Sequence, residues 1–151
     1  MHVYEGTITY TKTLFQIDGN TLNTPEKAYQ YLKDIAEQFP YQETLWAILL
    51  DNKSHALFRI MLTKGTLTSS LVSPREVFSP AIISGAASVI LAHNHPSGCV
   101  DPSSADVQVT RAIRQAGEIL NIPLVDHLIL GHPDMNANGK AFYSFREAGL
   151  V

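Results

Sequence analysis

Two histidines at the end of a short apolar run constrain the fold of this chain more than any other feature. Residues 88–92 are apolar enough to form a buried strand, and His93 and His95 follow at once. In an extended chain, side chains at positions i and i+2 point to the same side. The two imidazoles are therefore predicted to share one face of a sheet, at the end of one of its buried strands.

A carboxylate, Asp106, follows His95 by eleven residues, at the head of a predicted helix. Two imidazoles and one carboxylate can form the three protein ligands of a catalytic zinc site, which leaves a fourth position for water. The pattern Ser103-x-x-Asp106 is also close to a capping box, and a carboxylate in the first turn suits the helix dipole. Because this helix must start close to the turn after His95, we favour ligation for Asp106. Ser103 can cap the helix or donate to a developing oxyanion.

A hydrolytic metal site also needs a general base beside its water. Three upstream glutamates have structural explanations: Glu76 completes a capping box, and Glu26 and Glu37 fit a solvated helix face. Glu43 stands at the head of residues 43–50, which are predicted to form a strand buried on both faces. It is the leading candidate for the base, and the alternative is an exposed residue at the entry of a strand.

Other metal sites that begin with His-x-His need residues that this sequence does not have. The metallo-β-lactamase pattern needs aspartate and histidine where Ser97 and Gly98 stand, and a cupin needs a glutamate near Cys99 and Val100. An amidohydrolase barrel needs a much longer chain.

The remaining pattern predicts a mixed α/β domain. An antiparallel meander of three strands is expected at residues 43–50, 55–62 and 66–72. Three later strands are expected at residues 88–92, 124–130 and 142–145. One helix is predicted between Thr24 and Pro40. Another begins at Ser73, and Pro80 is expected to kink or interrupt it. Residues 3–17 are assigned to a strand or a hairpin arm.

Composition supports one soluble, globular domain. The 151 residues are 45% hydrophobic and 17% charged, and the net charge is −3. No basic cluster is present, which argues against strong binding to DNA. Cys99 is the single cysteine, which excludes an internal disulfide. No signal peptide or membrane span is recognisable, so we expect a cytoplasmic protein with no membrane contact.

The order His93-x-His95, then Ser103 after seven residues and Asp106 after two more, with an upstream glutamate, resembles the JAMM motif of the MPN/JAB metalloprotease superfamily. The sequence His-Asn-His-Pro-Ser-Gly at residues 93–98 is similar to that of the RadC branch of the superfamily. Three further segments support this similarity: residues 73–76, 125–127 and 143–145. The resemblance covers roughly residues 40–149.

This resemblance implies a cytidine-deaminase-like MPN/JAB fold, with a mixed, largely antiparallel sheet flanked by helices. Residues 41–151 would be the RadC-like domain and residues 1–40 an N-terminal extension. The implied cofactor is Zn²⁺, with His93, His95 and Asp106 as its ligands. Glu43 would be the general base, and Ser103 would assist the tetrahedral intermediate. The implied activity is that of a bacterial zinc-dependent metallopeptidase or isopeptidase acting on a peptide or protein.

Two alternatives to the hydrolase are considered. The first is a DNA-repair or DNA-associated RadC-type factor with a non-proteolytic activity. RadC proteins usually carry a helix-hairpin-helix region, and residues 1–40 are too short for one and contain none of its glycine-containing hairpins. The second is a non-catalytic interaction module, but such MPN domains typically lose metal ligands that this chain keeps. No oligomeric state is predicted.

Several polar residues have two interpretations. Asp126 and His127 are neighbours in a predicted strand, so only one can point toward the site. The one that does could orient a ligand imidazole, or His127 could be a core histidine bonded to nearby backbone. Cys99 is expected to be a small packing residue, with adventitious zinc binding as the alternative. His55 and His132 are expected at the surface.

Overall fold

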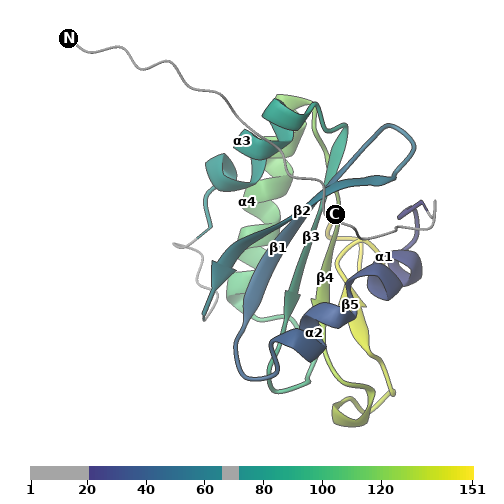
Figure 1. The fold of residues 1–151 in the computed structure, drawn as a ribbon. Coiled ribbons are helices and arrows are strands. Elements are labelled where there is room, and N and C mark those ends of the chain that lie inside the picture. Colours follow the sequence, from purple (N-terminus) through teal and green to yellow (C-terminus); the bar gives the residue numbers. More distant parts are fainter. Residues whose placement is uncertain (1–20, 66–71) are drawn as a thin grey trace.

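A five-stranded sheet with helices on both faces forms the body of the molecule (Figure 1). The computed structural model describes residues 21–65 and 72–151. The strand or hairpin arm predicted in residues 3–17, and residues 66–71 of the third predicted meander strand, lie outside this described part. The predicted mixed α/β class is confirmed.

The strands follow the order β2-β1-β3-β4-β5, so β3 lies at the centre of the sheet. All neighbours pair in antiparallel fashion except β3 and β4, which are parallel. The sheet is therefore mixed and largely antiparallel, as predicted. The strand bounds are Thr44–Leu50 for β1, Ala56–Lys64 for β2, Ser88–Asn94 for β3, Leu124–Leu130 for β4 and Phe142–Ser144 for β5.

The helices are α1 (Pro25–Leu32), α2 (Asp34–Gln38), α3 (Pro74–Ser84) and α4 (Ser104–Leu120), with a short 3₁₀ helix, η1, at Pro133–Met135. The single helix predicted before Pro40 is divided at Lys33. Of the kink or interruption expected at Pro80, the interruption was wrong, because α3 runs on through it. The carbonyl of Glu76, which Pro80 cannot bond, belongs to an exposed residue that water can reach.

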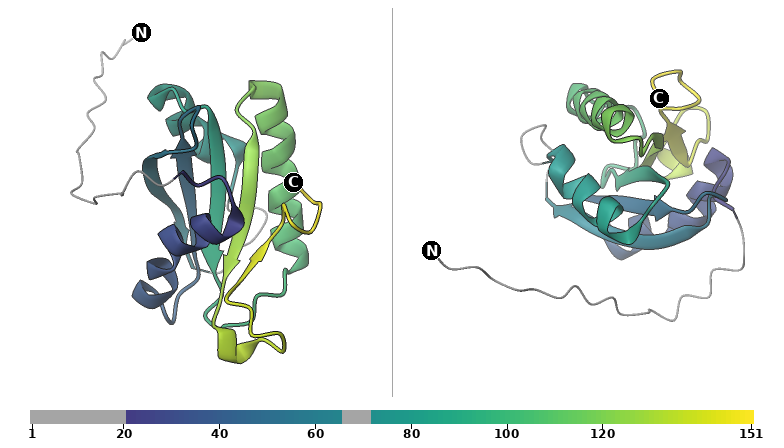
Figure 2. Two further views of the ribbon diagram at one scale, coloured as in Figure 1. Left: turned by 90° about the vertical axis from the view of Figure 1, so that its right-hand side faces the viewer. Right: turned by 90° about the horizontal axis from the view of Figure 1, so that it is seen from above.

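Two hydrophobic cores lie on opposite faces of β1 and β3. Helices α3 and α4 pack over one core, through side chains such as Phe78 and Ile113. Helices α1 and α2 pack over the other, through Leu32 and Ile35. The two layers of helices are visible when the sheet is viewed along its edge (Figure 2). Burial on both faces explains why β1 and β3 are almost continuously apolar in sequence.

The β1–β3 pairing places two distant parts of the chain side by side. Leu45 pairs with His93 in the antiparallel register, so the start of β1 lies next to the end of β3. The backbone N–H of His95 donates to the carbonyl of Leu130 over 2.9 Å, which ties the chain after β3 to the end of β4. The described residues include no helix that is both long and apolar enough to cross a membrane.

Candidate metal centre

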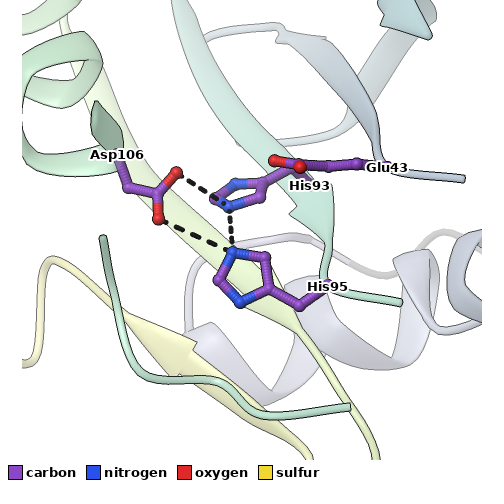
Figure 3. A group of neighbouring side chains, drawn as sticks. All are labelled: Glu43, His93, His95 and Asp106. Atoms are coloured by element: carbon purple, nitrogen blue, oxygen red, sulfur yellow. Dashed lines mark hydrogen bonds and ion pairs between the residues drawn. The ribbon is translucent and has the colours of Figure 1, made fainter. Parts of the chain in front are cut away.

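Four side chains from three segments of the chain converge at the end of β3. They are Glu43, His93, His95 and Asp106, and each offers one ligand atom within 4.8 Å of the others. Glu43 directly precedes β1, the two histidines end β3 and follow it, and Asp106 lies in the first turn of α4 (Figure 3). The structure thus brings together the two histidines, the aspartate and the glutamate that the sequence predicted as site residues.

The ring nitrogens of the histidines face each other and the carboxylate. His93 Nε2 lies 3.0 Å from His95 Nε2 and 3.1 Å from Asp106 Oδ1, while His95 Nε2 lies 3.6 Å from Asp106 Oδ2. The side chains of His93 and Asp106 are buried, and that of His95 keeps 17% of its surface exposed. The group therefore has a buried interior and one side that solvent reaches.

A hydrogen bond fixes the tautomer of neutral His95. Its Nδ1 lies 2.7 Å from the carbonyl oxygen of Cys99. A carbonyl only accepts, so Nδ1 carries the proton and the lone pair of Nε2 points into the group. Two imidazoles and one carboxylate whose donor atoms face one another form a set of ligands that suits zinc. The residues present therefore fit a metal ion.

The protonation of Asp106 and His95 is coupled. Burial alone would raise the pKa of Asp106, but the two neighbouring imidazoles and the hydrogen bonds from Ser103 hold it well below its usual range. Burial penalises the charged form of His95, yet its bonds to Asp106 and to the Cys99 carbonyl raise its pKa above the ordinary histidine value. Both shifts stabilise the charged form of the group, the anion of Asp106 and the cation of His95.

Ser103 caps α4, which is one of the two roles that the sequence predicted for it. Its hydroxyl and its backbone N–H both donate to Asp106 Oδ2 over 2.7 Å, and the Asp106 N–H donates back to the hydroxyl over 3.2 Å. This reciprocal arrangement is a capping box. Ser103 therefore touches Asp106 and does not belong to the four-residue group.

Asn94, which lies between the two histidines, connects β3 to the segment that carries Glu43. Because alternate residues face opposite sides of a strand, its side chain points away from that of His93. Its Oδ1 accepts from the backbone N–H and the hydroxyl of Thr44, over 2.9 and 2.7 Å. Its Nδ2 donates to the carbonyls of Phe39 and Gln42, both over 2.9 Å. All four hydrogen-bonding positions of this buried amide are thus used.

Sequence analysis did not identify Asn94 as a functional residue. The one available signal was a polar side chain in a strand predicted to be buried, where polar groups are expected to have hydrogen-bond partners. Those partners lie about fifty residues earlier in the chain, and the spacing of residues in β3 does not reveal them.

Asp126 and His127 point to opposite faces of β4, as predicted. His127 Nε2 lies 2.8 Å from His93 Nδ1, so His127 is the one that contacts a residue of the group. Asp126 accepts from the Ser144 hydroxyl over 2.7 Å and from the Arg146 N–H over 3.0 Å. Burial raises the pKa of Asp126 and places that of His127 well below the ordinary value.

The other candidates lie outside the four-residue group. The Cys99 thiol is 3.4 Å from Asp101 Oδ2 and is only partly buried. His55 contacts Asp51 over 3.0 Å and its side chain is 39% exposed. The side chain of His132 is 67% exposed, as expected of a surface residue.

Gly131 allows the turn after His95 to lie close to the end of β4. A Cβ atom at Gly131 would meet the carbonyl oxygen of Gly98 and the side chain of Val100. We therefore expect Gly131→Ala to lower the free energy of unfolding by about 1–3 kcal/mol, because the backbone of this turn must move. Urea denaturation measures the change, and an unchanged midpoint would show that the turn has room to shift.

Comparison with known proteins gives consistent matches over most of the chain. Residues 22–150 match the family model of the RadC-like JAB domain. A UPF0758 protein of Geobacter sulfurreducens is 41% identical over 135 residues, which are 89% of this chain and 56% of that protein. A UPF0758 protein of Chlorobaculum parvum is 46% identical over 110 residues, 73% of this chain and 46% of that protein. The chain thus spans about half the length of the curated relatives it matches.

Proposed function

Because the chain belongs to the family of RadC-like JAB domains, we propose that it is a zinc-dependent hydrolase that cleaves peptide or isopeptide bonds. The observation that carries this proposal is the convergence of two imidazoles and two carboxylates within 4.8 Å. Three of these groups are enough to hold a metal ion, and the fourth remains for proton transfer. The resemblance of the motif to JAMM peptidases supports the choice of reaction.

The residues that would hold the metal are His93, His95 and Asp106. A zinc ion held there would polarise a substrate carbonyl and lower the pKa of a coordinated water to about 7. The capping bonds from Ser103 leave Asp106 Oδ1 directed at His93, while Oδ2 lies nearer His95. Burial of His93 and Asp106 keeps this part of the site free of competing water.

Glu43 is the general base. It is half-buried, as a residue that must exchange protons with water and substrate needs to be. Its carboxylate takes a proton from the attacking water and delivers it to the leaving amine, so that it ends the cycle unprotonated. The antiparallel pairing of β1 with β3 and the Asn94 bonds to Gln42 and Thr44 hold Glu43 beside the histidines.

Ser103 stabilises the oxyanion of the tetrahedral intermediate. Its hydroxyl proton can turn from Asp106 toward a developing negative charge, because the Ser103 backbone N–H still donates to the same carboxylate oxygen. The cap and the catalytic role are therefore compatible.

The substrate approaches from the side where His95 is exposed. His95 also lines a pocket of about 130 Å³, together with residues that include Phe39 and His132. Pro96 and Ser97 are exposed on the turn beside it, which leaves an open rim. An open rim can accept an extended peptide segment, and the small pocket has room for one of its side chains.

Metal analysis tests the proposal. Purified wild-type protein is expected to hold about one zinc ion per chain after incubation with zinc and gel filtration, measured by atomic emission. The double variant His93→Ala/His95→Ala is expected to hold almost none, because two of three ligands are gone. The matched control is His55→Ala/His132→Ala, which removes two histidines outside the group and should bind zinc like the wild type. Equal zinc contents in the wild type and the His93/His95 variant would overturn the proposal.

A further inference from the structure

A buried chain of hydrogen bonds leads away from the metal site through residues to which neither the motif nor the proposed mechanism gives a role. His93 Nδ1 lies 2.8 Å from His127 Nε2, and His127 Nδ1 lies 2.7 Å from the hydroxyl of Thr110. The Thr110 hydroxyl donates over 2.7 Å to the backbone carbonyl of Asp106, one turn earlier in α4. His93, His127 and Thr110 are all at most 1% exposed. The chain of bonds therefore starts and ends on two of the proposed metal ligands.

The direction of each hydrogen bond follows from the group at the far end, the backbone carbonyl of Asp106. A carbonyl oxygen only accepts, so the single proton of the Thr110 hydroxyl is used on Asp106. The Thr110 oxygen must then accept from His127 Nδ1, which therefore carries a proton. A neutral His127 has its lone pair on Nε2 and accepts from His93 Nδ1. His93 consequently carries its proton on Nδ1 and its lone pair on Nε2.

We infer that Thr110 and His127 are positioning residues that hold His93 in the tautomer able to bind a metal through Nε2. The inference rests on the proposed metal site, because His93 Nε2 is the atom that faces His95 and Asp106. Hydrogen bonds to the second nitrogen of a ligand histidine orient the ring and typically change metal affinity 10- to 100-fold when lost.

The surroundings of His127 support a positioning role. The ring of Phe145 stacks on that of His127, with centroids 4.9 Å apart and planes inclined by 12°. The backbone N–H of Phe145 also donates to the His127 carbonyl over 3.0 Å. The imidazole is therefore held by a stacked ring as well as by hydrogen bonds at both nitrogens. His95 differs, since its second nitrogen bonds directly to a backbone carbonyl.

The substitution Thr110→Val tests the inference because it removes the hydroxyl and keeps the shape of the side chain. His127 Nδ1 then has no acceptor there, so its proton can move to Nε2 and oppose the required tautomer of His93. We expect zinc affinity, measured by competition with a chromophoric chelator, to fall about 10- to 100-fold. The control Thr110→Ser keeps the hydroxyl and should stay within about threefold of the wild type. Wild-type affinity in Thr110→Val, or equal losses in both variants, would overturn the inference.

Nuclear magnetic resonance of the metal-free wild-type protein provides a second measurement. Long-range ¹H–¹⁵N correlation at about pH 8, above the ordinary histidine pKa, distinguishes the two neutral tautomers. We expect the proton of His93 on Nδ1, and a shift of its population toward Nε2 in Thr110→Val. A His93 proton on Nε2 in the wild type would overturn the inference. Since no metal is present, this result is independent of the success or failure of the proposed hydrolase function.

Discussion

Replacing Glu43 with glutamine is expected to lower the rate of hydrolysis by about 10²- to 10⁴-fold while the zinc content stays at the wild-type level. Glutamine keeps the shape of the side chain but cannot accept a proton from water at neutral pH. The three proposed ligands are unchanged in this variant. The measurement combines zinc analysis with the turnover of a fluorogenic peptide or isopeptide that the wild type cleaves, selected from a library.

Glu37→Gln is the matched control for this experiment, because Glu37 is an exposed glutamate of α2 outside the four-residue group. It should retain wild-type turnover. Full activity in Glu43→Gln would place the base elsewhere. Loss of zinc from Glu43→Gln would instead make Glu43 a metal ligand, which its distance from the other three groups also permits.

Asn94→Leu is expected to cause the largest loss of stability among single substitutions near the site, about 3–5 kcal/mol in the free energy of unfolding. Leucine branches at the same carbon as asparagine but is larger, and it can form none of the four hydrogen bonds of Asn94. The Thr44 N–H and the carbonyls of Phe39 and Gln42 would lose their partner, and each buried group left unpaired costs about 1–3 kcal/mol. Water can reach some of them, which keeps the total below the full sum.

Urea denaturation in the presence of a chelator measures this effect apart from any loss of metal. Asn138→Leu, at an exposed position of the loop before β5, is the control and should stay within about 0.5 kcal/mol of the wild type. A loss of less than about 1 kcal/mol in Asn94→Leu would mean that residues 39–44 keep their conformation without the amide.

Local patterns in the sequence predicted much of the fold. The apolar runs gave the bounds of β1 and β4 to within one residue, because strands buried on both faces are continuously apolar. The capping box predicted at Ser73 is present, and so is the one left as an alternative at Ser103, since a cap depends on residues only three positions apart. The break at Lys33 and the continuity of α3 through Pro80 depend on packing and on solvent, and the local sequence does not determine either.

The candidate site was predictable to the extent that its spacing is local. His93, His95 and Asp106 lie within one strand–turn–helix segment, so their convergence followed from the periods of strand and helix. Glu43 required an additional argument, because the β1–β3 register that brings it to the site connects residues about fifty positions apart. Thr110 was not identified, since a threonine inside a helix gives no indication that its hydroxyl meets a histidine of β4.

The four site residues lie at the start of β1, at the end of β3 and in the first turn of α4, which links metal binding to the folding of the entire sheet. In an unfolded chain only His93 and His95 remain near each other, and Glu43 and Asp106 join them only after β1 has paired with β3 and α4 has docked. Zinc would consequently bind the native state far more tightly than the unfolded ensemble. At a free metal concentration a thousand times its dissociation constant, this preference would add about 4 kcal/mol to the stability of the domain.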